Sequence, residues 1–386
     1  MTGANILLAI EAMSELDEMA LAAREQGYSL RVLAEDARYY GETFAEVVEF
    51  PTRDDTELEN YVRDNLSSIA QVFSVTDTWG VIASKLRDRF GFHQFGDTAK
   101  LEFFRDKQAV ENELIARGFA RPSEASQSGP KIMKLRSGTG KIGVHLVESE
   151  AAISEVVLNS GHSGPEFVVQ DFYFGPAYSA EVWRDTEREI FFGVTNRILS
   201  EPPFFTEKVK SFPWVPNSNW ERSVKDWVFG LLRALDYTLG QAHVEFIETT
   251  EGFRLVEINA RMAGAMITPG ILRTTNFNPY AMAVNQALGV APCSETSREI
   301  QGGFSHVSIY ADRTGTIRNI RGIDTLARFP GSPQWFPSRG QGDIISELGT
   351  YKSRIGNVAA IGETASIAQD RAISASQAIK VEIAED

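Results

Sequence analysis

The sequence predicts an α/β fold made of several domains. Its 386 residues exceed what one hydrophobic core usually organises, so roughly two to four domains or subdomains are expected. Near the N-terminus, apolar segments with strand character alternate with segments of helical periodicity, which is typical of parallel α/β units. Hydrophobic residues make up 43% and charged residues 23% of the chain, as in ordinary globular proteins.

The first expected domain, residues 1–97, reads as a parallel, Rossmann-like unit. Strand and helix patterns alternate in it, and Gly27 ends the first helical pattern. The expected elements are a strand over 4–10, a helix over 15–26, a strand over 28–34, a strand at 73–75 and a helix over 78–89.

Three further units are expected, over residues 98–172, 173–291 and 292–386. The last is predicted to be a separate α/β domain after a linker-like stretch at 291–299. The expected elements are helices over 102–118, 149–160, 221–239 and 279–289, a hairpin over 131–147, strands over 166–172, 178–183, 304–310 and 379–384, and an ordered loop over 200–220.

The net charge of −14 and the single cysteine, Cys293, limit the classes of partner. A strongly acidic chain is a poor ligand for nucleic-acid phosphates or an anionic membrane, although a local basic site is compatible with it. One cysteine excludes a disulfide framework and a cysteine-based metal site, and it fits a reducing compartment. No stretch approaches the roughly 20 apolar residues of a membrane span. We expect a cytoplasmic protein with neither nucleic acid nor membrane as partner.

A second hairpin is predicted over residues 242–261, AHVEFIETTEGFRLVEINAR. A three-residue loop centred on Glu251, with Gly252 in the left-handed position, is a common hairpin connection. Opposed side chains on such a hairpin have Cβ atoms roughly 4.5–5.5 Å apart. The expected register pairs Ile247 with Leu255, Glu245 with Glu257 and His243 with Asn259.

This register places Glu245 and Glu257 where their charges repel, and a divalent cation between them removes the repulsion. Together with Asn259 they offer only oxygen ligands, which suit a hard ion such as Mg²⁺. Arg261 lies just beyond the strand, where the chain turns at MAGAM. An ordinary hairpin with its acids in water is the alternative.

The segment KLRSGTGKIGV carries Gly138, Gly140 and Gly143 in a GxGxxG pattern. A dinucleotide-binding turn should open a helix after the first strand, but a strand pattern follows here. A glycine-rich hairpin whose backbone amides fold over phosphates fits better, with Lys134 at its base to neutralise charge. A plain flexible hairpin and a nicotinamide oxidoreductase are the alternatives.

Five motifs in this order resemble the ATP-grasp superfamily of carboxylate–amine ligases. The resemblance covers roughly residues 98–290 and implies an ATP-grasp fold. The first domain resembles the one that usually precedes that fold, and GFSHVSIY with GTIRNIRGI resembles the C-terminal domain of L-amino acid ligases. The motifs are FRDK (104–107), KLRSGTGKIGV (134–144), VVQDFYFG (168–175), HVEFI (243–247) and LVEINARMAG (255–264).

The resemblance implies an ATP site between two subdomains. Lys107 and Lys134 correspond to the two lysines that contact phosphate in the family. Gln170 departs from the acidic residue often found at the start of the adenine-contacting hinge, and Glu181 is a further candidate near the ribose or phosphates. The implied loop residues are Ser137, Gly138, Thr139, Gly140 and Gly143, and the implied hinge residues are Gln170, Asp171, Phe172 and Tyr173.

The resemblance also implies the catalytic groups. Glu245, Glu257 and Asn259 would hold two Mg²⁺ ions, with Mn²⁺ as a substitute. Arg261 would face the reacting carboxylate and stabilise the oxyanion, together with backbone amides near Gly264. His243 is a candidate base for the amine, a pocket-shaping group or a structural histidine.

Arg197 and Glu207 lie in a segment that resembles the substrate-side region of peptide-forming relatives. Arg197 offers the bidentate geometry that holds a carboxylate. The alternative for this pair is a salt bridge on the surface.

The implied activity is an ATP-dependent ligase that joins an amino acid or related carboxylate to an amine through an acyl phosphate, releasing ADP and phosphate. The expected partners are small-molecule carboxylates and amines, and a homodimer is expected. The alternatives are an ATP-grasp ligase of another class, either nucleotide-precursor or carboxylase-like, and a non-catalytic nucleotide-binding module.

Overall fold

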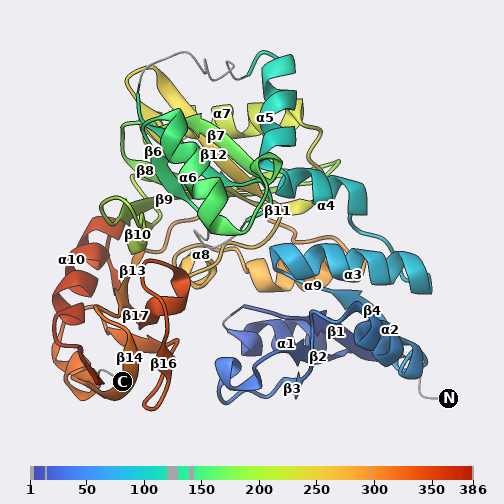
Figure 1. The fold of residues 1–386 in the computed structure, drawn as a ribbon. Coiled ribbons are helices and arrows are strands. Elements are labelled where there is room, and N and C mark those ends of the chain that lie inside the picture. Colours follow the sequence, from blue (N-terminus) through green and yellow to red (C-terminus); the bar gives the residue numbers. More distant parts are fainter. Residues whose placement is uncertain (1–3, 14, 120–128, 139–142, 296, 385–386) are drawn as a thin grey trace.

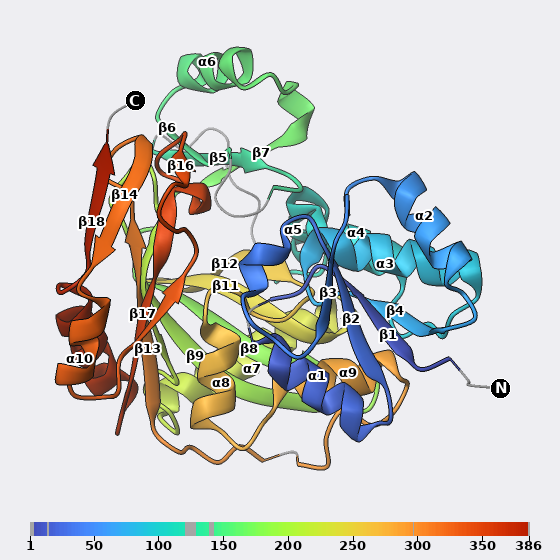
Figure 2. The same cartoon turned by 90° about the horizontal axis from the view of Figure 1, so that it is seen from below.

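The computed structural model describes residues 4–13, 15–119, 129–138, 143–295 and 297–384, and it confirms the predicted α/β class (Figure 1). Three groups of elements surround the centre of the molecule. In Figure 1 the N-terminal sheet lies at the lower right and the C-terminal elements at the lower left. The small sheet β6-β5-β7 lies above both (Figures 1 and 2).

The N-terminal sheet is fully parallel, as predicted, with strand order β3-β2-β1-β4. Helices α2 and α3 cover one face through Leu58, Val62 and Leu86, and α1 covers the other through Met19. Strand β3 and helix α2 lie in a stretch where no element was predicted. The elements are β1 Ile6–Ile10, α1 Leu16–Glu25, β2 Ser29–Ala34, β3 Glu46–Glu49, α2 Asp55–Asp64, β4 Ile69–Phe73 and α3 Asp77–Phe90.

The single helix predicted over 102–118 is wrong, because the chain breaks at Asp106. Helix α4 spans Thr98–Arg105 and α5 spans Lys107–Ala116. Asp106 has extended backbone angles, and its carboxylate accepts the amide protons of Gln108 and Ala109 at 3.1 and 3.2 Å. It therefore caps α5 and places Lys107 at the first helical position.

The small sheet has the order β6-β5-β7, and the predicted hairpin over 131–147 is confirmed. Met133, Val147 and Phe167 form its small core, against which the apolar side of α6 packs. The elements are β5 Lys131–Leu135, β6 His145–Val147, α6 Glu150–Ser160 and β7 Phe167–Asp171.

One eight-stranded sheet, in the order β12-β11-β8-β9-β10-β13-β17-β15, runs through the rest of the chain. The predicted boundary at residues 291/292 does not separate two sheets, because β13 pairs with β10 from Val209–Val307 to Phe212–Phe304. The ordered loop predicted over 200–220 is wrong in its middle, where β10 lies. The strands are β8 Ala177–Arg184, β9 Glu189–Leu199, β10 Glu207–Phe212, β11 Gly240–Thr249, β12 Gly252–Asn259, β13 Gly303–Tyr310, β15 Gln334–Pro337 and β17 Arg354–Gly362.

Helices connect this sheet to its neighbours. Val224, Val228 and Leu232 of α7 pack on the sheet, while Tyr280 and Val284 of α9 pack on the N-terminal sheet beside α1. The remaining strands form a small sheet, β16-β14-β18. The remaining elements are α7 Asn219–Ala234, α8 Ile267–Thr274, α9 Pro279–Ala287, β14 Gly315–Arg321, β16 Ile344–Ile345, α10 Ala365–Ser376 and β18 Lys380–Ala384.

The β11–β12 hairpin confirms the predicted pairs Glu245–Glu257 and His243–Asn259 by a different route. Its turn has two residues rather than three, since Thr249 pairs with Gly252. A bulge at Val256 of β12, between Leu255 and Glu257, then restores the register, because one strand gains a residue relative to the other. Nearer the turn the predicted pair Ile247–Leu255 is wrong, since Ile247 pairs with Arg254.

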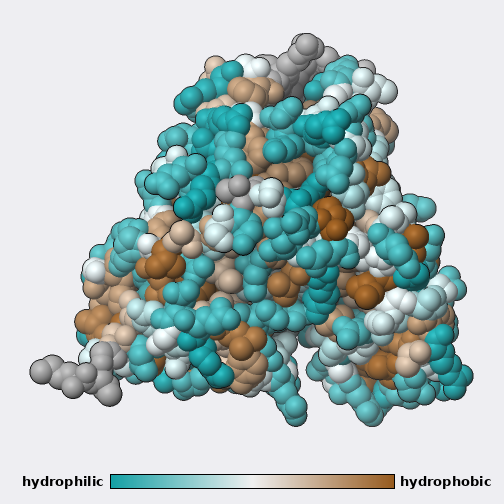
Figure 3. All heavy atoms as spheres, turned by 180° about the vertical axis from the view of Figure 1, so that it is seen from behind, coloured by the Kyte–Doolittle hydropathy of each residue, from teal (hydrophilic) through white to brown (hydrophobic). Residues whose placement is uncertain are grey.

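The face shown in Figure 3 is largely hydrophilic with small scattered hydrophobic areas, as the acidic composition leads one to expect. A notch separates the two lower lobes on this face. Among the described helices, none is long and apolar enough to cross a membrane.

Candidate active site

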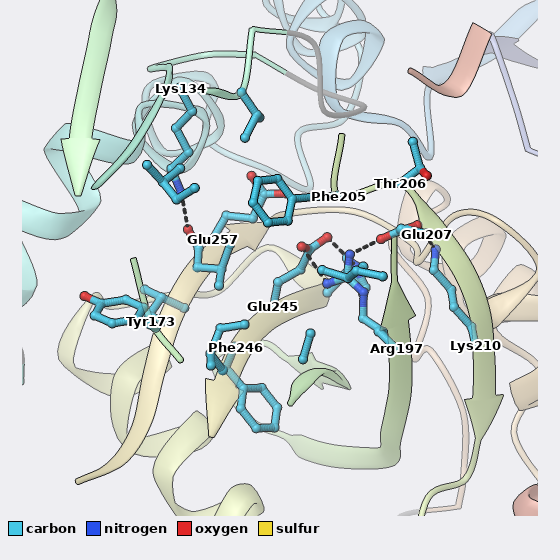
Figure 4. A pocket seen from close by; sticks show the side chains of 18 of the residues that line it. Lys134, Tyr173, Arg197, Phe205, Thr206, Glu207, Lys210, Glu245, Phe246 and Glu257 are labelled. Carbon is cyan, nitrogen blue, oxygen red and sulfur yellow. Dashed lines mark hydrogen bonds and ion pairs between the residues drawn. The ribbon is translucent and has the colours of Figure 1, made fainter. Parts of the chain in front are cut away.

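A cavity of about 680 Å³ lies between the small sheet and the eight-stranded sheet (Figure 4). Fourteen predicted site residues line it, and they come from β5, the segment after β7, the β11–β12 hairpin, β9, β10, α5 and the turn after β12. These are Lys107, Lys134, Gly138, Gln170, Asp171, Phe172, Tyr173, Arg197, Glu207, His243, Glu245, Glu257, Arg261 and Gly264.

The glycine-loop residues divide at the limit of the described chain. Thr139 and Gly140 lie outside the described residues. Ser137 lines a small adjoining pocket with Asn259. Gly143 has a φ of 68° and approaches Leu135 so closely that an added Cβ would lie 3.0 Å from that side chain, which accounts for glycine there.

The two predicted phosphate lysines both reach the β12 strand. Lys107 Nζ lies 3.1 Å from Glu257 Oε2 and donates to the Gly138 carbonyl at 2.8 Å. Lys134 is 6% exposed, and its Nζ donates to the Val256 carbonyl at 2.9 Å (Figure 4). Two ammonium groups, one from α5 and one from β5, therefore contact the same strand of the hairpin.

A carboxyl group from helix α5, which the sequence analysis does not predict, lies beside the first residue of the hinge. Gln170 Nε2 donates to Glu111 Oε2 of α5 at 2.8 Å. Burial raises the pKa of Glu111, and the bond from Gln170 opposes that rise. Next along the chain, Asp171 forms an ion pair with Lys131 of β5. The acid missing from the hinge itself is therefore present one helix away.

The opposed carboxylates of Glu245 and Glu257 are compensated by side chains. Arg197 Nη1 lies 2.5 Å from Glu245 Oε2, and Lys107 pairs with Glu257. Asn259 Nδ2 donates to Glu257 Oε1 at 3.1 Å, which leaves its amide oxygen as an acceptor. These oxygen donors are of the type that Mg²⁺ prefers. Among the described residues, no three His, Cys, Asp or Glu side chains are grouped to hold a metal, and the predicted set needs Asn259 as its third member.

Arg197 does not present an open guanidinium to substrate, contrary to the predicted bidentate role. It is 4% exposed and lies between Glu245 and Glu207, both of which it pairs with (Figure 4). Burial lowers the pKa of Arg197, but the two carboxylates outweigh burial and raise it. Lys210 pairs with the other oxygen of Glu207, so Glu207 also has its charge matched. The alternative of a surface salt bridge is equally wrong, because the network is buried.

Glu181 is not in the cavity wall, contrary to prediction. It is 2% exposed, and it accepts hydrogen bonds from Ser179 Oγ at 2.7 Å and Thr195 Oγ1 at 3.0 Å. Its Oε2 lies 2.8 Å from His243 Nδ1, because β8 and β11 pair these two residues. Burial raises the pKa of Glu181, and His243 outweighs that effect and lowers it.

His243 lies between two carboxylates, since its Nε2 is 3.2 Å from Glu245 Oε1. Burial lowers its pKa, but Glu181 and Glu245 outweigh burial and raise it. Both ring nitrogens of His243 face a carboxylate oxygen, so neither nitrogen is open to a substrate amine. This geometry favours the positioning of Glu245 over the role of amine base.

Arg261 is held by a residue from the N-terminal domain. Its Nε donates to Asp77 Oδ2 at 2.6 Å, and its Nη1 donates to the Met262 carbonyl at 2.8 Å. Burial lowers the pKa of Arg261, and Asp77 outweighs burial and raises it. The chain then turns through Ala265 and Met266, whose φ values of 48° and 65° are uncommon for residues with a Cβ.

Several residues of the site carry no local signal in the sequence. Asp77 and Glu111 lie on helices far from the motifs, and Lys210 was assigned to a loop. Three cavity-lining residues come from the C-terminal elements, namely Tyr310, Tyr351 and Arg354. For Lys210 alone, the spacing Glu-x-x-Lys after a proline-rich stretch was a usable signal.

Comparisons with known proteins agree with this architecture. Residues 307–384 match the family model described as L-amino acid ligase C-terminal domain 2. The chain is 29% identical over 362 residues to an uncharacterized protein, y4rH, of Sinorhizobium fredii, a match covering 87% of this chain and 74% of that protein.

Two solved structures share the fold. L-amino acid ligase from Bacillus licheniformis matches with a TM-score of 0.84 and 17% identity, covering 100% of both chains. The biotin carboxylase domain dimer of Hydrogenobacter thermophilus 2-oxoglutarate carboxylase, in complex with MgADP, ADP and bicarbonate, matches with a TM-score of 0.74 and 15% identity, covering 99% of this chain and 91% of that one. At these identities the likeness shows the fold, and the resemblance stated from the motifs is confirmed at that level.

Proposed function

From the premise that this chain is an ATP-grasp ligase in fold, with a C-terminal domain of the L-amino acid ligase type, we propose that it forms an amide bond between a carboxylate substrate and an amine. The carboxylate is first phosphorylated by ATP, and the products are ADP, phosphate and the amide. The observation that carries the proposal is the convergence of Lys107, Lys134, Glu245, Glu257 and Arg261 on one cavity.

The first half-reaction needs charge neutralisation and alignment more than covalent help from the protein. One oxygen of the substrate carboxylate attacks the γ-phosphorus, and ADP leaves. Lys107 and Lys134 are the ammonium groups that neutralise the phosphates, and the hinge from Gln170 to Tyr173 receives the adenine. Gln170 is oriented by Glu111, so its amide oxygen faces away from that carboxylate and accepts from the adenine amino group.

Glu245, Glu257 and Asn259 fit magnesium by the chemistry of their oxygens, and we propose that they hold two ions, with Mn²⁺ able to replace Mg²⁺. The bound ions supply charge compensation for the triphosphate. The Hydrogenobacter carboxylase domain named above binds MgADP, which supports the assignment.

The second half-reaction is attack of the amine on the acyl carbon. The tetrahedral intermediate carries a negative oxygen, and Arg261, fixed by Asp77, is the fixed positive charge next to Glu257 that stabilises it. The strained turn at Ala265 keeps the backbone near Gly264 close to the same point. We assign His243 to the positioning of Glu245, which its Nε2 contacts at 3.2 Å.

The proposal is tested by measuring nucleotide products while amino acids and small carboxylates are supplied singly and in pairs. ADP release that requires both a carboxylate and an amine is expected. Release of AMP and pyrophosphate in an amine-dependent reaction would refute the acyl-phosphate route.

A second candidate is a carboxylase-like or nucleotide-precursor ligase, favoured by the TM-score of 0.74 to the biotin carboxylase domain. The C-terminal domain match weighs against it. ADP release that depends on bicarbonate and needs no amino acid would establish it in place of the amide ligase.

We also propose the four-part division at 97/98, 172/173 and 291/292, a cytoplasmic location and a homodimer. The biotin carboxylase domain above is described as a dimer, which supports the last point. Light scattering during gel filtration measures the mass directly, and 42.7 kDa would contradict the dimer.

A further inference from the structure

Arg354 brings a positive charge into the cavity from the C-terminal part of the chain. It is the first residue of β17 and pairs with Tyr310 of β13. Both residues line the cavity together with Glu207 and Lys210. Tyr310 contacts Glu207 directly, since its hydroxyl donates to the Glu207 backbone carbonyl at 3.3 Å.

A row of polar residues crosses the neighbouring strands β9, β10 and β13 of the eight-stranded sheet. Arg197 pairs with Lys210, and Lys210 pairs with His306 of β13. Because directly opposed residues of antiparallel strands share a face, these side chains project from the cavity side of the sheet. On β17 the partner of His306 is Ala359, so the row ends at β13, and Arg354 lies beside it at the start of β17, opposite Tyr310.

Arg354 differs from Arg197, Lys210 and Arg261 in its partners. Arg197 and Lys210 are paired with Glu207, and Arg261 is paired with Asp77. Arg354 donates through Nε to Ser338 Oγ at 3.2 Å, and within the described part of the chain no carboxylate pairs with it. Among the described residues, Arg354 therefore lines the cavity without a carboxylate partner of its own.

An arginine placed in this way suits a carboxylate, because its planar donors match two carboxylate oxygens. Arg197, the residue first expected to hold a substrate carboxylate, is saturated by two glutamates. Arg261 and the lysines are assigned to the reacting carboxylate and to phosphate.

We propose that Arg354 binds a carboxylate that does not react, carried by one of the two substrates. This inference rests on the proposed ligase function and narrows the class of substrate. At least one of the two substrates carries a carboxylate in addition to the group that reacts. That carboxylate belongs either to an amino acid acting as the amine or to a dicarboxylic acid acting as the acyl donor.

The test compares wild type with Arg354→Gln and Arg354→Lys, with Arg321→Gln as control. Arg321 belongs to the same part of the chain, but its side chain is 63% exposed and pairs with Glu382 at the surface. One arm offers an amino acid and its carboxamide as the amine. The other arm offers a dicarboxylic acid and its half-amide as the acyl donor. Hydroxylamine, which captures an acyl phosphate as a hydroxamate, measures the first half-reaction without the amine substrate.

In Arg354→Gln the KM for the anionic substrate is expected to rise about 10- to 100-fold in one arm, as for loss of a charged hydrogen-bonded pair. The KM for ATP stays within about twofold, and the KM for the amidated substrate is the same in variant and wild type. Arg354→Lys, which keeps the charge without the planar donors, should lie between the two.

The outcomes separate the two claims. If wild type yields neither ADP nor hydroxamate with any pair, the proposed function fails and the inference fails with it. If wild type is active but Arg354→Gln has an unchanged KM in both arms, or loses equally with the amidated substrates, only the inference is overturned. Arg321→Gln should match wild type throughout.

Discussion

The contact between Asp77 and Arg261 predicts that the N-terminal domain takes part in catalysis. Asp77 is the first residue of α3, and its carboxylate accepts from Arg261 Nε at 2.6 Å. The two side chains are 12% and 17% exposed, so solvent screens the pair only slightly. Asp77→Asn keeps the shape and one acceptor oxygen but removes the charge.

The expected loss of activity depends on which interactions Arg261 keeps in the Asp77→Asn variant. Hydrogen bonds to charged groups contribute about 1.5–3 kcal/mol, and breaking a fully buried pair costs about 3–5 kcal/mol. Arg261 keeps its bond to the Met262 carbonyl and its attraction to Glu257, so the lower range applies. About 2 kcal/mol of lost transition-state stabilisation corresponds to about a 30-fold fall in kcat.

The assay is steady-state ADP release with the substrate pair found in the screen. A fall in kcat with little change in the KM for ATP is expected, because Arg261 acts on the oxyanion and not on the nucleotide. Asp312→Asn is the matched control, since Asp312 pairs with Arg313 at the surface and should leave kcat unaltered. An Asp77→Asn enzyme with wild-type kcat would refute the role assigned to this contact.

Three further predictions concern the cavity wall. The pKa of His243 is raised, because Glu181 outweighs burial, so its stabilisation is complete below about pH 6.5 and is lost as pH rises through the folded pKa. The difference in Tm between wild type and His243→Gln should therefore shrink with increasing pH in calorimetry. Gln170→Glu sets a second carboxyl beside Glu111 and should weaken ATP binding several-fold in calorimetric titration, whereas equal affinity would exclude the hinge assignment. Glu257→Gln should abolish ADP release with little change in Tm, and chelation with EDTA should do the same until Mg²⁺ or Mn²⁺ is added back; an active Glu257→Gln would remove the metal assignment.

The hairpin that carries the acids was predictable because its information is local. Alternation of polar and apolar residues over 242–261 required that Glu245 and Glu257 share a face, whatever the turn. The predicted turn is one residue too long and the bulge at Val256 is not predicted, yet the two errors cancel at Glu257. The residues at a bulge have no distinctive composition. The pairing of the two acids could therefore be predicted, but not the turn length and the bulge that produce it.

The strand β10 was missed because its burial removes the usual pattern. Val209, Lys210, Ser211 and Phe212 are all buried, so no polar face alternates with an apolar one. Lys210 is buried on the cavity side, and Ser211 is buried on the other, where its hydroxyl donates to Gln369 of α10 at 2.9 Å. The prolines and aromatic residues on either side of this segment are then typical of a loop.

The partners of the catalytic arginines could not be predicted for a different reason. Asp77 and Arg261 lie 184 residues apart, and a single sequence carries no information on which distant side chains meet. The same holds for Arg354, which reaches the cavity only because β13 joins the C-terminal part to β10. Motifs therefore indicate the groups that we propose to react, whereas the residues that hold those groups in place depend on tertiary structure.

The network also explains why the two opposed glutamates are not equivalent. Glu245 is 8% exposed and contacts both Arg197 and His243, themselves buried, so moving its carboxylate would remove one of the two carboxylate partners of each. Glu257 has a side chain that is 22% exposed, and its cation partner is Lys107, whose flexible stem also reaches the Gly138 carbonyl. A flexible lysine that contacts one acid and a carbonyl exchanges partners at lower cost than an arginine held by two acids. When a triphosphate binds, Lys107 can exchange Glu257 for a phosphate oxygen. Arg197 keeps both of its carboxylate partners, Glu207 and Glu245. We therefore expect Glu245 to act as a fixed part of the wall and Glu257 to be the carboxylate whose partner changes during the reaction.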